Sequence, residues 1–373
     1  TASMHSTSTG LPSFVCRQTP TITFGGGALF AVSPDTFQPT FSMSFSESLF
    51  KDNHAAYVPP PPGSAWSLIV RVGGGAVNAI SASSPFQDAL LSCNIQWMTF
   101  SGNTVSSADQ VGSLTSGQGG AGYFDNLVVE VMQTRVIHNS AQWEGGGFFF
   151  TSSCTMSISG SSTFQLNSAL RGGAVFSSGV ASLTNMTCIQ NRASQRGGCA
   201  SLDSDDSVHT ISAIVMGNFS PMGGGISVAG EGPVRIFNSF FHQNVAQNLG
   251  GALVVFLRLN GNVTVTNSSI TSNSVLSGLG GALTMLVGSN SITFTSTVFE
   301  DNASLNMHGG SVYVEGSIPA YLVFEGCLFR NNWAKFTGGA VDATTNIFAD
   351  FVHCTFVNNS ALQGGASSAT IGP

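Results

Sequence analysis

Side chains that can carry catalysis or hold a metal are few in this sequence. Only 8% of residues are charged. Asp203, Asp205 and Asp206 share one short segment, and grouped carboxylates can hold Ca²⁺. Glu325 and Asp350 are spaced so that the repeat described below places them on adjacent coils, as acid–base glycoside chemistry requires. We interpret the first set as a solvated acidic turn. We interpret the second as ordinary surface charges, because no Lys or Arg and no third acid accompanies them on the same column in neighbouring coils.

The remaining reactive residue types indicate no site. The seven His residues show no H-x-x-x-H spacing, and the seven Cys residues show no C-x-x-C spacing. The Gly-rich segments are periodic turns before strands, which is not the strand–loop–helix context of a phosphate-binding loop. The sequence therefore predicts no catalytic residue, no metal ligand, no cofactor and no enzymatic activity.

An internal repeat positions all of these residues. From Gly119 onward a Gly-Gly pair recurs every 25–30 residues. Most pairs follow an apolar residue, two variable residues and Asn, as in Phe299-Glu-Asp-Asn302, and alternating apolar residues follow each pair. Alternation is typical of strands, and short strands in a repeating unit bury a face only by stacking. The repeat predicts an all-β fold, a right-handed single-stranded parallel β-helix of about eleven coils.

The same register predicts an inward column of stacked side chains and the domain limits. The column contains Val265, Phe294, Phe324 and Phe351. Residues 1–24 are expected to form an N-terminal segment, and residues 25–373 the β-helix. Insertions are expected at 54–73 and 104–118, both entering at the same turn. Insertions on one face of a solenoid are often its binding face, but we favour tolerated surface loops.

One Asn recurs once in each coil and is expected to form a ladder. Side chains stacked about 4.8 Å apart can hydrogen-bond along the solenoid, and Asn tolerates left-handed turn geometry. The predicted ladder consists of Asn191, Asn218, Asn244, Asn273, Asn302, Asn332 and Asn359.

The cysteines and the sequons indicate a secreted glycoprotein. Cys327 and Cys354 share one position of adjacent coils, so we predict a disulfide between them, which implies an oxidising compartment. The pairing of Cys16, Cys93, Cys154, Cys188 and Cys199 stays open. Six N-x-S/T sequons permit glycosylation, at Asn185, Asn218, Asn262, Asn267, Asn302 and Asn358.

Outward positions of the strand before the Asn motif are also predicted. One position is assigned to Ser182, His209, Arg235, Thr264, Thr293, Val323 and Asp350, and a second to Thr184, Ile211, Phe237, Thr266, Thr295, Glu325 and Val352. The stacked Thr residues are typical of an ice-binding surface, although Thr is also a good strand former. The many apolar outward residues indicate an interaction surface.

The repeat resembles a known family. Gly-Gly-Ala followed by an aliphatic residue, as at Gly280-Gly-Ala-Leu283, alternates with Phe-x-x-Asn. This is similar to the repeat of the chlamydial polymorphic membrane proteins and of surface proteins of algae and protists. The resemblance covers roughly residues 24–373. It implies a surface-exposed passenger used in adhesion.

These observations predict an extracellular or cell-surface structural and adhesive protein, a subunit or segment of an assembly or filament. Expected partners are copies of itself or a longer chain, end to end or laterally, together with cell-surface proteins or glycans. A net charge of −7 argues against nucleic acid, and no apolar run has the length of a membrane span. The alternatives are a polysaccharide-acting lyase or hydrolase, or a glycan- or ice-binding module.

Overall fold

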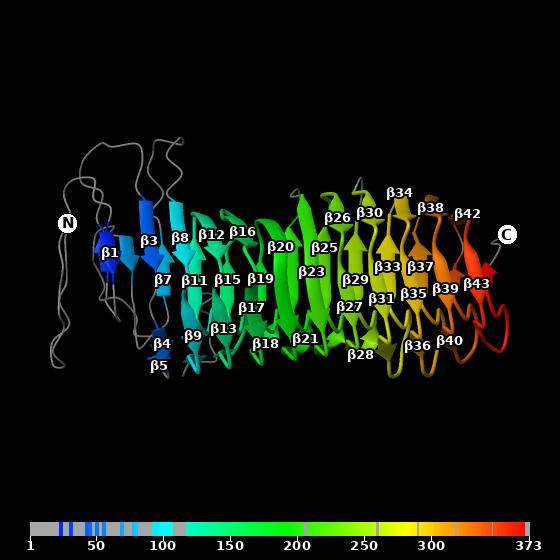
Figure 1. Cartoon of the computed structure of the whole chain (residues 1–373), viewed down its shortest axis with the longest axis horizontal. Helices are drawn as coiled ribbons and strands as arrows, with labels where there is room; N and C mark the ends of the chain where they lie inside the picture. The colour runs from blue at the N-terminus through cyan, green and yellow to red at the C-terminus, as the bar shows by residue number, and fades with distance from the viewer. Residues whose placement is uncertain are drawn as a thin grey trace.

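The chain winds into an elongated all-β solenoid of parallel strands with about nine turns (Figure 1). This computed structural model describes residues 92–106, 117–204, 208–258, 261–288, 291–317, 319–344 and 346–369, together with strand segments at 22–24, 30–32, 42–46, 49–51, 54–56, 68–70 and 77–80. The predicted all-β solenoid of parallel coils is confirmed.

Three parallel sheets run the length of the solenoid, and each coil contributes to them in the same order. The first sheet has 21 strands, β1 (Ile22–Phe24), β3 (Ser42–Ser46), β4 (Leu49–Lys51), β8 (Ser92–Gln96), β9 (Thr99–Ser101), β12 (Val128–Met132), β13 (Arg135–Ile137), β16 (Thr155–Ser159), β17 (Ser162–Gln165), β20 (Val180–Ile189), β23 (His209–Met216), β26 (Val234–Phe237), β27 (Phe240–His242), β30 (Val263–Thr266), β31 (Ser269–Thr271), β34 (Ser291–Thr295), β35 (Val298–Glu300), β38 (Ala320–Glu325), β39 (Leu328–Arg330), β42 (Ile347–Val352) and β43 (Thr355–Val357). The second sheet has 10 strands, β5 (His54–Ala56), β10 (Thr104–Ser106), β14 (Ser140–Ala141), β18 (Ser168–Arg171), β21 (Arg192–Arg196), β24 (Phe219–Met222), β28 (Val245–Leu249), β32 (Ser274–Val275), β36 (Ala303–Ser304) and β40 (Trp333–Ala334). The third sheet has 11 strands, β7 (Val77–Ile80), β11 (Gly122–Asp125), β15 (Phe148–Phe150), β19 (Val175–Ser177), β22 (Ala200–Ser204), β25 (Ile226–Gly230), β29 (Leu253–Leu257), β33 (Leu283–Val287), β37 (Val312–Gly316), β41 (Val341–Ala343) and β44 (Ser367–Ala369).

The turn count and the domain limits differ slightly from those predicted. Among the described residues, nine turns with a strand in every sheet lie between β8 and β41. The predicted number, about eleven coils, is higher because it also includes the repeat units before β8 and after β41. β1 already pairs with β3, so strand pairing begins before residue 25. β5 and β10 pair with each other, so 54–56 and 104–106 belong to the second sheet and not to insertions. Within the first insertion, β6 (Leu68–Val70) pairs with β2 (Phe30–Val32). Most of 1–24 and of both insertions lies outside the described residues.

The interior is filled by columns of apolar side chains, one from each coil. Register pairs Val265 with Phe294, Phe294 with Phe324 and Phe324 with Phe351, as predicted. The rings of Phe294 and Phe324 stack with centroids 4.7 Å apart. Phe294 is completely buried, whereas its neighbour Thr293 is partly exposed. Burying alternate side chains in this way drives the stacking of coils that are individually unable to form a core.

Three corners in a coil are formed by single residues in the left-handed region. One lies between the two strands of the first sheet, as at Asn267 (φ 46°), and one lies before the second sheet, as at Ser272 (φ 55°). The third is the first glycine of the Gly-Gly pair, as at Gly250 (φ 56°). The second glycine serves close approach, because a Cβ on Gly251 would lie 2.1 Å from the carbonyl oxygen of Gly281 in the next coil.

The left-handed geometry expected for the ladder asparagines was wrong. The residue before each ladder Asn makes the turn, as Asp301 (φ 54°) does before Asn302. The physical reason is that the ladder side chain must point into the solenoid to reach the next coil. The turn is therefore completed one residue earlier.

The outward assignment of His209 and Ile211 was wrong by one residue. The register pairs His209 with Ala181 and Ile211 with Ile236, and both side chains are buried. A β-bulge shifts the pairing of β20 with β23, which moves every side chain of the displaced segment to the opposite face. Thr210 therefore takes the outward position.

Candidate functional site

The buried asparagines form a continuous hydrogen-bonded ladder between coils. Each side-chain Nδ2 donates to Oδ1 of the next Asn at 2.8–3.1 Å, along Asn103, Asn139, Asn167, Asn191, Asn218, Asn244, Asn273, Asn302, Asn332 and Asn359. The seven residues expected from the sequence are joined by Asn103, Asn139 and Asn167. Asn103 and Asn167 occupy the same Phe-x-x-Asn position and could have been included.

The amide of Asn273 shows how a ladder residue between two others is satisfied. Asn273 Oδ1 accepts from both the backbone nitrogen and Nδ2 of Asn244, each at 3.0 Å. Asn273 Nδ2 donates to the carbonyl of Phe241 at 3.1 Å as well as to Asn302. Only a carboxamide offers both two donors and an acceptor in this space, whereas a column of carboxylates would stack like charges.

The disulfide predicted between Cys327 and Cys354 is not formed. The two residues do lie on adjacent coils, but both are free thiols. Cys327 Sγ donates to the carbonyl of Phe294 at 3.6 Å, and Cys354 Sγ donates to that of Phe324 at 3.3 Å. Ser268 uses the same corner position to donate to a carbonyl at 2.8 Å, so these thiols replace hydroxyls. Burial raises the pKa of Cys327 to about 11, which disfavours the reactive thiolate.

A different pair of cysteines is bonded. Cys188 and Cys199 form a disulfide inside one coil, with Cα atoms 5.8 Å apart. Cys188 replaces the Phe of the Phe-x-x-Asn motif and Cys199 replaces the Ala of Gly-Gly-Ala, so both face the core. Cys93 and Cys154 are buried free thiols, and Cys16 lies outside the described residues.

The six sequons differ in accessibility. Asn185, Asn262, Asn267 and Asn358 are exposed. Asn218 and Asn302 are completely buried members of the ladder. Only the first four can carry a glycan in the folded protein, because the amide nitrogen that would be modified is buried and bonded within the ladder in the other two.

Side chains at the Gly-Gly corner form a distinct row along the solenoid. We call these residues, each immediately before a Gly-Gly pair, the corner row. Its described members are Gln118, Glu144, Arg171, Arg196, Met222, Leu249, Leu279, His308, Thr337 and Gln363. The row is polar at both ends and apolar in the middle, and it borders the outer face of the third sheet.

The first polar end of the corner row is a charged network. Arg171 pairs with Glu144 and, at 3.4 Å, with Asp203, which also pairs with Arg196. Burial raises the pKa of Asp203 although both guanidiniums oppose the rise. Asp203 is thus an ion-pair partner, and Asp205 and Asp206 lie outside the described residues. No group of three or more His, Cys, Asp or Glu residues suited to a metal occurs in the described part of the chain.

An aromatic stack adjoins this network. Tyr123, Phe149 and Phe176 stack on the outer face of the third sheet, with centroids 5.0 and 5.3 Å apart. The Arg171 guanidinium lies 4.9 Å from the centre of the Phe176 ring. The Arg171 guanidinium therefore covers the Phe176 end of the aromatic stack, so the charged network lies over an apolar surface.

The carboxylates considered for glycoside chemistry are not register partners. Asp350 pairs with Val323, and Glu325 pairs with Val352, so the two acids are offset along adjacent strands. The geometry therefore gives no reason to change their interpretation as surface charges.

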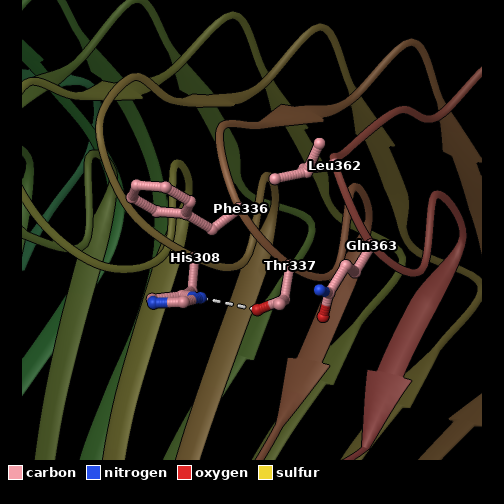
Figure 2. A pocket seen from close by; sticks show the side chains of 5 residues that line it. All are labelled: His308, Phe336, Thr337, Leu362 and Gln363. Atoms are coloured by element: carbon pink, nitrogen blue, oxygen red, sulfur yellow. Dashed lines mark hydrogen bonds between the residues drawn. The ribbon is translucent and has the colours of Figure 1, made fainter.

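The second polar end of the corner row lines a depression of about 380 Å³ (Figure 2). Its lining residues are His308, Phe336, Thr337, Leu362 and Gln363. His308, Thr337 and Gln363 come from three successive coils. Thr337 Oγ1 donates to the Asp342 carboxylate and lies 2.6 Å from His308 Nδ1. This hydroxyl lies between the imidazole and the carboxylate, which differs from the nucleophile–His–Asp order of a hydrolase triad.

Sequence reasoning missed both polar ends of the corner row. The available signal was the residue before each Gly-Gly pair, which reads Gln, Glu, Arg, Arg at one end and His, Thr, Gln at the other.

In the part of the chain that is described, no helix has the length and hydropathy needed to cross a membrane.

Stacked coils, a buried Asn ladder and glycine corners together define a parallel β-helix protein. The model of the right-handed β-helix region matches residues 173–361, about half of the 373 residues. The chain therefore belongs to the right-handed β-helix family, and the predicted handedness is confirmed. No curated protein and no solved structure matches the chain.

Replacing Asn273 by Ala should destabilise the solenoid by about 3 kcal/mol, because it leaves buried donors of Asn244 and the carbonyl of Phe241 unpaired. Chemical denaturation measures the change. Asn306→Ala is the matched control, since Asn306 is exposed and its two side-chain hydrogen bonds, to the carbonyl of Leu276 and from Lys335, are open to water. Equal effects of the two substitutions would contradict the role assigned to the ladder.

His209 should make the fold sensitive to acid. Its ring is buried with no partner for either nitrogen, and this burial lowers its pKa to about 4. The unfolded chain takes up a proton near pH 6.5, so stability present above that pH is lost as the pH falls towards 4, by about 3 kcal/mol. His209→Leu should lack this part of the loss, as measured by denaturation at pH 7 and 4. His242→Leu, which removes a partly exposed His, is the control. An identical pH dependence in wild type and His209→Leu would rule the effect out.

Proposed function

We propose that this chain is an extracellular or cell-surface structural and adhesive rod, without enzymatic activity, that associates laterally with copies of itself. The observation that carries the proposal is an apolar stripe on the outer face of the first sheet. It consists of Tyr321, Phe348, Val352 and Val357, of which Tyr321 is 61% and Phe348 57% exposed. The two rings stack with centroids 5.5 Å apart, which gives the stripe an aromatic pair at one end.

A second copy fits this stripe better than a charged partner. No charge separates Tyr321 from Phe348, whereas Asp350 lies between Phe348 and Val352 on β42 and Glu325 is the register partner of Val352. Arg330, at the edge of the stripe, already pairs with Glu300. Large exposed apolar patches rimmed by polar residues mark interaction sites, and a two-fold contact would bury the same stripe on both chains. The resemblance to adhesive chlamydial repeats agrees with such a role.

Support for an extracellular location comes from covalent chemistry. The Cys188–Cys199 disulfide persists in oxidising compartments, and four sequons are exposed on the folded surface. Support for a non-enzymatic role comes from the corner row, where the described acids and arginines pair with one another.

Secretion from a eukaryotic cell should give glycans at Asn185, Asn262, Asn267 and Asn358 and none at Asn218, because its buried amide donates to the ladder. Asn302 should be unmodified for the same reason. Glycopeptide mapping of the folded, secreted chain measures occupancy at each site. Four empty exposed sequons would contradict the glycoprotein proposal, and a glycan on Asn218 would contradict the ladder.

Sedimentation velocity over a range of concentrations tests association. The wild-type chain should self-associate, and the double substitution Tyr321→Ser with Phe348→Ser should shift it to the monomer, because it removes the two most exposed apolar side chains of the stripe. Leu305→Ser, at an exposed leucine on another face, should change nothing. A wild-type chain that stays monomeric at high concentration would reject lateral assembly. Association unchanged in the double variant would place the contact elsewhere, including end to end.

A further inference from the structure

Thr337 and Gln363 bring a nucleophile and a carboxamide together across neighbouring coils. They form a parallel bridge, so their side chains leave the backbone at the same level of adjacent turns. Both line the depression at the second polar end of the corner row. Figure 2 shows the Gln363 carboxamide on the side of Thr337 opposite His308, while the Thr337 hydroxyl points toward His308.

The Asp342 carboxylate contacts the Thr337 hydroxyl and can act as its base. Thr337 Oγ1 donates to a carboxylate oxygen of Asp342, which is 4% exposed. His308 Nδ1 lies 2.6 Å from the same hydroxyl oxygen and 3.6 Å from the Asp342 carboxylate. Burial raises the pKa of Asp342, against opposing contributions from Thr337 and His308, which brings this group closer to the proton affinity of an effective acid–base catalyst.

We propose that Thr337 and Gln363 react with each other to form an intramolecular ester that links two coils. Asp342 takes the hydroxyl proton as Thr337 Oγ1 bonds to the carboxamide carbon of Gln363. The carbon–nitrogen bond then breaks, the nitrogen receives that proton from Asp342, and ammonia leaves. One alcohol and one amide become one ester and one ammonia, with no change of oxidation state. The reaction occurs once per chain.

The fold supplies what this reaction requires in water. Stacking holds the two groups in register, so that the attack is intramolecular and needs no substrate binding. The side chains of Phe336 and Leu362 border the two groups (Figure 2), and His308 contacts the hydroxyl oxygen from the other side. Other neighbouring polar residues in the corner row do not combine a hydroxyl with a carboxamide. The Glu144 and Arg171 pair, for example, has no hydroxyl.

Mass spectrometry of the full chain, reduced and deglycosylated, tests the proposal. The intact mass should be lower than the sequence mass by one ammonia, and proteolysis should yield one peptide joining the segments that contain Thr337 and Gln363. Alkaline hydroxylamine should separate the segments, because it cleaves esters, whereas its cleavage of the Asn260-Gly261 bond lies outside both segments. Thr337→Val and Gln363→Glu should each abolish the joined peptide.

Two further variants separate chemistry from folding. Asp342→Asn keeps both reacting groups and removes the base, so the link should form about a hundredfold more slowly. Thr271→Val is the matched control, because Thr271 Oγ1 also lies near a histidine nitrogen, at 2.9 Å in His242, and it should leave the link unchanged. Circular dichroism checks that each variant is folded. Separate peptides at full mass in the wild type, or a joined peptide that survives in Thr337→Val, would overturn the proposal.

Discussion

The buried Asn ladder is the interaction on which the stacking of coils depends. A ladder carboxamide accepts two hydrogen bonds from one neighbouring coil and donates to the other, so each coil satisfies polar groups that it cannot satisfy alone. The ladder lies beside the apolar columns of the core, where an unpaired amide would cost free energy. Hydrophobic burial drives the coils together without fixing their relative positions. The ladder adds that positional specificity, because a shift of one residue would break hydrogen bonds in every coil.

Fixed stacking determines where chemistry can arise in this fold. Residues 25–30 positions apart in the sequence become direct neighbours, so every polar cluster is a row along the axis. The charged network is one such row, in which Arg171 contacts Glu144 of the preceding coil and Asp203 of a later one. The His308, Thr337 and Gln363 row is another. A substitution at one position therefore acts on the coils before and after it.

The repeat predicted most of the fold because glycine and asparagine have strict backbone and hydrogen-bonding roles here. Gly250 needs a positive φ and Gly251 has no room for a Cβ, so their positions mark the corner in every coil. The bulge between Thr184 and Met186 of β20, which shifts the pairing of His209 by one residue, could not be read from the sequence, because an Ala or a Thr is acceptable on either face. The disulfide was misplaced because spacing reports which cysteines stack. It does not report that Cys327 is already bonded to carbonyl oxygens, or that Cys188 and Cys199 meet across the interior of one coil.

The corner row shows how one position is used differently along the same solenoid. In its middle the row is apolar, with Met222, Leu249 and Leu279, and Val254 on the adjoining third sheet is fully buried. Apolar packing is sufficient there. At Thr337 the same position carries a hydroxyl that contacts His308 of the preceding coil and the buried Asp342 carboxylate. The stability of a repeat protein is a sum over neighbouring units, so different kinds of contact can contribute at different interfaces between coils. Polar groups at this end of the row can add directional or covalent bonds between coils to the apolar burial that all coils share.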